Sequence, residues 1–162
     1  MDDEPAVPEV RPPTIDDVRR ICRALDEAGA RYVLIGGFAV ILHGGERTTK
    51  DIDLLVDPDP ENVERLKRAL SVLEDDAARE IDPDDLQKYR VVRVADEVMV
   101  DLLAVACEVT WSEASVSALR MDLQGTPVIY ADVATLIRTK RTVRPSDAAD
   151  SAWLESLRDE KE

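Results

Sequence analysis

The chain has 162 residues, of which 44% are hydrophobic and only 4% aromatic, and a formal charge of −14 from 35 acidic and 21 basic residues. This length and composition are typical of one globular domain with a core built from aliphatic side chains. The negative charge argues against broad, non-specific binding to nucleic acid, which needs a positive surface.

The first 13 residues are acidic and rich in proline, which predicts a flexible arm ahead of a single domain over residues 14–162. This arm lacks the apolar core of a signal peptide, and no apolar run reaches the roughly 20 residues that span a bilayer. Cys22 and Cys107 lie in apolar patterns outside any CxxC motif, so we expect buried, reduced thiols. Together these features predict a cytoplasmic protein without a membrane partner.

The predicted domain begins with a helix that Thr14 caps and Gly29 ends. A short buried strand over residues 32–35 runs into Gly36-Gly37, which opens a second helix over residues 38–43. The next strand covers residues 51–56. The later elements are a helix over 61–73, an acidic loop over 74–85, a hairpin of strands 88–94 and 98–105, a helix over 112–119, a strand over 127–130, and helices from 132 and from 146.

This order predicts an α/β (α+β) fold, in which a small mixed β-sheet is flanked by helices and further helices follow at the C-terminus. In such a fold the glycine turn, the strand over residues 51–56 and the second hairpin strand could meet at one edge of the sheet. Their side chains are therefore candidates for a shared site.

Two acids, Asp51 and Asp53, alternate with apolar residues on the predicted strand, so their side chains point to the same face. Adjacent carboxylates repel each other, which makes the pair unfavourable unless a cation lies between them. A solvated edge strand that uses charge to prevent aggregation is the alternative interpretation of the pair.

Asp101 is a single acid within an apolar strand, and such an acid is costly to bury unless it is paired or binds a metal. Three carboxylates can hold two Mg²⁺ ions, which prefer oxygen ligands and are often shared with substrate phosphates. Two such ions assist the transfer of a phosphoryl or nucleotidyl group. The backbone at Gly36-Gly37 can approach a triphosphate closely.

Gly36-Gly37, the string Arg47-x-Thr49-x-Asp51-Ile-Asp53 and Asp101 together resemble the nucleotidyltransferase fold of the polymerase-beta type. The resemblance is closest to a minimal bacterial branch that includes AbiEii-like and MenT-like toxins, and it covers about residues 15–157. The tail Leu136-Ile-x-x-Lys140-x-x-x-Arg144-Pro-Ser-Asp147-x-x-Asp150 supports it independently of the acids.

The resemblance implies roles for individual residues. Asp51 and Asp53 would bind both metal ions, and Asp101 would bind one ion and deprotonate the acceptor hydroxyl. The phosphate-binding residues would be Gly36, Gly37, Arg47, Thr49, Lys140 and Arg144, with Asp147 in support. A basic helix end that is simply solvated would also explain Lys140 and Arg144. The chain departs from the usual Gly-Ser pattern at Gly37, which removes one hydroxyl contact to phosphate.

The predicted function is the Mg²⁺-dependent transfer of a nucleoside monophosphate from an NTP to an acceptor hydroxyl. A tRNA end is a candidate acceptor, as in the toxin branch, and an antitoxin is a candidate partner. One alternative acceptor is a small molecule such as an aminoglycoside or lincosamide, as in antibiotic nucleotidyltransferases. Another alternative is a non-catalytic module of a toxin–antitoxin pair that binds a nucleotide or a partner.

Overall fold

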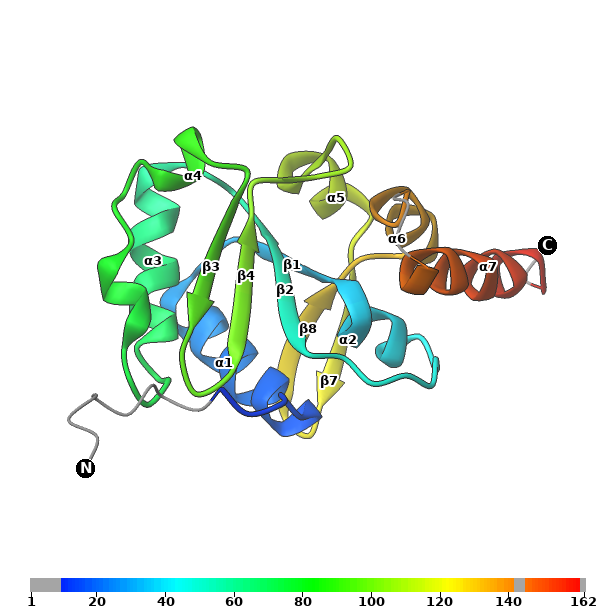
Figure 1. The fold of residues 1–162 in the computed structure, drawn as a ribbon, viewed down its shortest axis with the longest axis horizontal. Helices are drawn as coiled ribbons and strands as arrows, with labels where there is room; N and C mark the ends of the chain where they lie inside the picture. The colour runs from blue at the N-terminus through cyan, green and yellow to red at the C-terminus, as the bar shows by residue number, and fades with distance from the viewer. Residues whose placement is uncertain (1–9, 142–144, 161–162) are drawn as a thin grey trace, which may run out of the picture.

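A six-stranded mixed sheet forms the centre of the protein, in a computed structural model that describes residues 10–141 and 145–160 (Figure 1). The strand order is β3-β4-β2-β1-β8-β7. Strand β2 runs parallel to β4 and antiparallel to β1, and β1 runs parallel to β8. The strands of this sheet are β1 (Tyr32–Ile35), β2 (Asp51–Val56), β3 (Val91–Ala95), β4 (Met99–Leu103), β7 (Leu119–Leu123) and β8 (Thr126–Tyr130).

Helices α1 (Ile15–Ala28) and α3 (Pro60–Leu70) lie behind the sheet in the view of Figure 1, whereas α2 (Gly36–Leu42) lies in front of it. The core between the sheet and α1 and α3 includes the fully buried Ile21, Leu34, Ile52 and Leu102. The other elements are a 3-10 helix (Ala77–Glu80), α4 (Asp85–Lys88), a small hairpin of β5 (Val105–Ala106) and β6 (Val109–Thr110), α5 (Trp111–Ser117), α6 (Val133–Thr139) and α7 (Pro145–Glu160).

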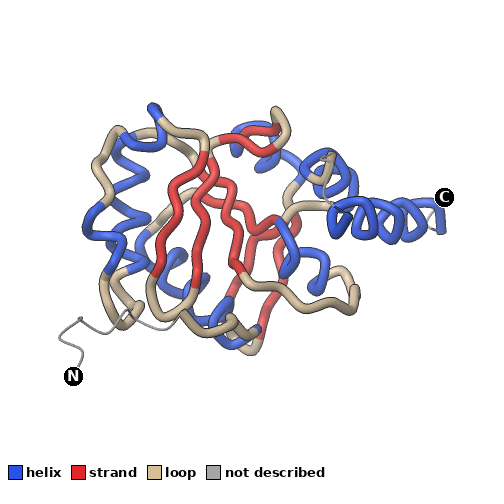
Figure 2. The backbone as a smooth tube through the Cα atoms, in the orientation of Figure 1, coloured by secondary structure: helices blue, strands red, loops and turns tan. Residues whose placement is uncertain are grey.

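Helix α7 extends away from the sheet at the C-terminal end, packed beside α6 (Figure 2). Among the described residues, no helix is both long enough and apolar enough to cross a membrane.

Local sequence explains where α1 begins and ends. The Thr14 side chain accepts a hydrogen bond from the backbone of Asp17, and the Asp17 carboxylate accepts one from the backbone of Thr14, which forms a capping box. Gly29 ends the helix in the left-handed conformation with φ 67°. Arg11 binds the same Asp17 carboxylate at 2.7 Å and reaches Glu97. Arg11, one of the first residues that the structure describes, is thus held against the domain by two ion pairs.

The predicted α/β class with a small mixed sheet is confirmed, and the helices and strands predicted between residues 14 and 56 match within a few residues. Three features were missed. Strand β7 has the sequence Leu-Arg-Met-Asp-Leu, whose apolar and polar residues alternate as in a half-buried strand, but the sequence analysis did not use this signal and its side chains are only partly buried or exposed. The β5–β6 hairpin is too short for any periodicity. Cys22 is buried as predicted, but Cys107 is exposed in that hairpin.

Candidate active site

Three carboxylates meet on two neighbouring parallel strands. Asp53 of β2 lies opposite Asp101 of β4 in the strand register, and Asp51 lies two residues before Asp53 on the same face. Oxygen atoms of the three side chains all lie within 4.8 Å of one another. We call Asp51, Asp53 and Asp101 the acid cluster.

Electrostatic repulsion is concentrated on Asp53. Burial raises the pKa of this carboxyl, and the nearby charges of Asp101 and Asp51 raise it further, to about 7. The side chain is therefore partly protonated at neutral pH unless a metal cation binds to the cluster. The residues fit Mg²⁺, because this hard cation prefers oxygen ligands and would relieve the repulsion that raises this pKa.

Gly36 makes room for Asp53. It has φ +73°, and a Cβ at this position would lie 2.3 Å from Asp53 Oδ2. Any side chain here would therefore displace the carboxylate as well as strain the backbone. The glycine predicted from the sequence to approach phosphate is thus also the residue that admits an acid of the cluster.

Thr49 occupies the space beside Gly37. A Cβ at Gly37 would lie 2.7 Å from both Cβ and Oγ1 of Thr49. The Thr49 hydroxyl donates a hydrogen bond to the backbone oxygen of Asp51 at 3.1 Å. A hydroxyl is thus present where the Gly-Gly sequence lacks a serine, and it comes from the loop before β2.

Lys140 lies at the end of α6 with only 8% of its surface exposed. Its Nζ is 3.3 Å from Asp147 Oδ1 and 3.0 Å from Asp150 Oδ2. Both acids belong to α7, so this helix supplies the carboxylates that stabilise a buried ammonium. Asp147, which the sequence analysis predicted as a supporting residue, thus lies beside Lys140.

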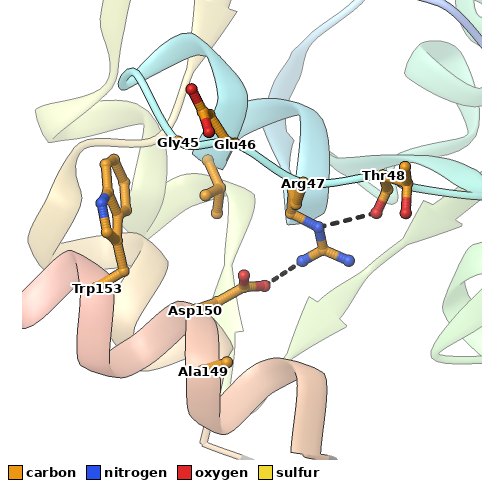
Figure 3. A pocket seen from close by; sticks show the side chains of 8 residues that line it. Gly45, Glu46, Arg47, Thr48, Ala149, Asp150 and Trp153 are labelled. Atoms are coloured by element: carbon orange, nitrogen blue, oxygen red, sulfur yellow. Dashed lines mark hydrogen bonds and ion pairs between the residues drawn. The ribbon is translucent and has the colours of Figure 1, made fainter.

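Arg47 joins the same network from the loop before β2. Figure 3 shows its guanidinium between the backbone oxygen of Thr48 and the carboxylate of Asp150, with Trp153 one helical turn further along α7. A pocket of about 440 Å³ lies between this loop and α7. Asp150 therefore contacts two of the cationic side chains that the sequence analysis placed near phosphate, Arg47 and Lys140.

A second pocket, of about 270 Å³, opens onto the acid cluster. It brings together most of the predicted site residues, which come from the glycine turn, the loop before β2, β2 itself, α6 and α7. The lining residues are Gly37, Arg47, Thr48, Thr49, Lys50, Asp51, Asp53, Lys140 and Asp147. We call this the cation pocket, after the positively charged side chains of Arg47, Lys50 and Lys140 that line it. Gly36 and Asp101 do not line this pocket. Arg144, a further predicted phosphate ligand, lies outside the described residues.

The sequence analysis assigned no role to three charged residues of the site, although it quoted Asp150 in the tail motif. Arg93 of β3 lies opposite Asp101 in the hairpin register, whereas pairing the two predicted strands directly about residues 95–97 would have placed Val91 there. Asp150 follows Asp147 by one helical turn. Lys50 precedes Asp51 and lines the cation pocket.

The sheet, the glycine turn and the acid cluster define a protein of the nucleotidyltransferase class. A family model described as the nucleotidyl transferase AbiEii toxin of a type IV toxin–antitoxin system matches residues 19–140, which is more than half of the chain. The chain therefore belongs to the AbiEii nucleotidyltransferase toxin family. The matched region contains the acid cluster and Lys140 and ends before α7. No curated protein matches the chain.

Proposed function

We propose that the chain is a divalent-cation-dependent nucleotidyltransferase that moves a nucleoside monophosphate from an NTP to an acceptor hydroxyl. The observation that carries this proposal is the acid cluster at one side of a pocket that also contains Arg47, Lys50 and Lys140. Carboxylates for metal ions and cations for phosphate thus lie within one small space.

In this proposal Asp51 and Asp53 hold two Mg²⁺ ions and Asp101 holds one of them. The bound ions would stabilise charge on the attacking and leaving oxygens. The acceptor oxygen forms a bond to the α-phosphorus, and its proton passes to Asp101. The bond from the α-phosphorus to the bridging oxygen breaks, and pyrophosphate leaves with the electron pair.

The triphosphate would lie in the cation pocket. Gly36 and Gly37 allow the phosphates to approach the backbone, and the Thr49 hydroxyl would donate to them after leaving the backbone oxygen of Asp51. Lys140 and Arg47 would neutralise phosphate charge after exchanging part of their pairing with Asp150. Asp147 would keep Lys140 in position, and Arg144 remains a proposed phosphate ligand.

The acceptor, the partner and the compartment remain proposals drawn from the family and the composition. We propose a tRNA end as the first acceptor to test, an antitoxin as partner and the cytoplasm as the site of action. The charge of −14 favours the second candidate, a small cationic acceptor such as an aminoglycoside, because a large RNA would be repelled.

The test is transfer of label from α-³²P-NTPs in Mg²⁺ to total cell RNA, or to a panel of aminoglycosides and lincosamides in parallel reactions. Transfer by the wild type that Asp53→Asn abolishes is the expected result, and the labelled fraction identifies the acceptor class. If neither arm is labelled and calorimetry detects no NTP binding, the enzymatic proposal is wrong. NTP binding without transfer to any acceptor would instead favour the non-catalytic module.

A further inference from the structure

Arg93 places a fixed positive charge on the acid cluster. Its Nε lies 2.8 Å from Asp101 Oδ1 and its Nη2 lies 3.0 Å from Asp101 Oδ2, so one guanidinium engages both oxygens of this carboxylate. The same Nη2 is 3.5 Å from Asp51 Oδ2. Arg93 thus bridges Asp51 of β2 and Asp101 of β4.

The arginine approaches from the open edge of the sheet. Strand β3 is an edge strand, and 57% of the Arg93 side chain is exposed, whereas that of Asp101 is 10% exposed. The guanidinium can therefore leave the carboxylate for water without disturbing the core. Each oxygen that it holds is also one that a divalent cation would use.

We propose that Arg93 is the resident counter-ion of the acid cluster and competes with the divalent cation for the oxygens of Asp101 and Asp51. Without the cation, one guanidinium offsets part of the repulsion among three carboxylates. When the cation binds, Arg93 gives up Asp51 and at least one oxygen of Asp101. This inference rests on the proposed function, since it assumes that the acid cluster binds the cation.

The test is Mn²⁺ binding to the full chain, measured by calorimetry without nucleotide. Arg93→Gln removes the competitor and is expected to tighten binding about threefold to fivefold, the upper part of the range for a largely exposed ion pair. Arg93→Lys keeps the charge but loses the planar fork, so its affinity should fall between the two. Arg90→Gln makes the same change in net charge just before β3 and should bind Mn²⁺ like the wild type.

Thermal unfolding gives a second readout. The melting temperature of Arg93→Gln should be below that of the wild type without Mn²⁺, and the two should converge in saturating Mn²⁺. A merely structural role for Arg93 would lower the melting temperature equally in both conditions.

The outcomes separate this inference from the proposed function. If the wild type binds Mn²⁺ and Arg93→Gln binds it equally or more weakly, Arg93 is not a competitor, while the metal site stands. If Arg90→Gln tightens binding as much as Arg93→Gln, the effect is one of net charge and the inference is likewise wrong. If none of the variants binds Mn²⁺ at millimolar concentration, both ideas fail.

Discussion

At the scale of single residues, the site depends on how closely Gly36 and Asp53 approach each other. The sequence suggests why a glycine belongs in the turn, but only the structure shows that the acid fills the space of the missing side chain. The pairing of Arg93 with Asp101 was missed for a related reason. A contact between strands depends on their register, and a slip of one residue would send the side chains of the shifted strand to the other face of the sheet.

We predict that Gly36→Ala disables the site. The new methyl group would displace the Asp53 carboxylate, and the positive φ would cost about 1–3 kcal/mol of the free energy of unfolding. Nucleotidyl transfer and Mn²⁺ binding should both be lost, as measured by label transfer and calorimetry. Gly125→Ala is the matched control, since Gly125 also has a positive φ (+88°) but nothing lies within 4 Å of its Cβ position. Equal loss of activity in both variants would contradict the steric argument.

We predict that Asp53 makes the metal-free protein less stable as the pH rises. Its pKa of about 7 in the folded protein lies above the ordinary value of 3.8, so the folded state holds a proton that the unfolded state has released between these values. The contribution of Asp53 to the free energy of unfolding is fully present below about pH 4 and is lost as the pH rises to about 7.

Urea unfolding from pH 4 to pH 8 in EDTA measures this effect as the difference between the wild type and Asp53→Asn. The variant should gain stability relative to the wild type across that interval, and Mg²⁺ should reduce the gain. Parallel curves for the two proteins would show that Asp53 keeps an ordinary pKa.

At the scale of elements, α7 acts as a source of carboxylates for cations on other segments. The tail sequence pointed to Lys140 and Asp147 together, because the two residues are only seven positions apart in the chain. It did not indicate that Asp150 also holds Arg47, since residues so far apart in sequence meet only through the packing of α7 beside α6. The sequence therefore predicted α7 but not the ion pair between Asp150 and Arg47.

We predict that Lys140→Gln weakens Mg²⁺–NTP binding about tenfold, or about 1.4 kcal/mol, because one charged contact to phosphate is lost. Calorimetry with a non-hydrolysable NTP measures this change, and circular dichroism checks the fold. Arg138→Gln is the control, since it removes the same charge from α6 at a side chain that pairs with Glu113 near the surface. Unchanged NTP affinity in Lys140→Gln would leave Lys140 with a structural role alone.

At the scale of the whole molecule, the charge of −14 sets how a nucleotide can bind. The cation pocket does not offset this charge locally, because Lys140 and Arg47 are already paired with acids of α7 and the acid cluster adds further negative charge. Composition alone predicted that non-specific binding of nucleic acid is unfavourable. Asp147 and Asp150, which tertiary packing places beside Lys140 and Arg47, make the binding of a bare anion unfavourable within the pocket as well.

We therefore predict that NTP binds only together with divalent cations. In Mg²⁺, an NTP at about 100 times its dissociation constant should stabilise the fold by about 2.7 kcal/mol, seen as a rise in melting temperature. In EDTA the same NTP should leave the melting temperature unchanged. A rise of equal size in EDTA would mean that the cations of the pocket suffice by themselves.

The contact between Gly37 and Thr49 has a consequence for how relatives of this chain vary. Because the two positions share one small volume, a hydroxyl can enter from the glycine turn or from the loop before β2, but not from both. We expect relatives with serine at the position of Gly37 to carry a smaller residue at the position of Thr49. In this chain, Gly37→Ser alone should lower nucleotidyl transfer, and the double variant with Thr49→Ala should restore it. The effect of a substitution at either position therefore depends on the residue at the other.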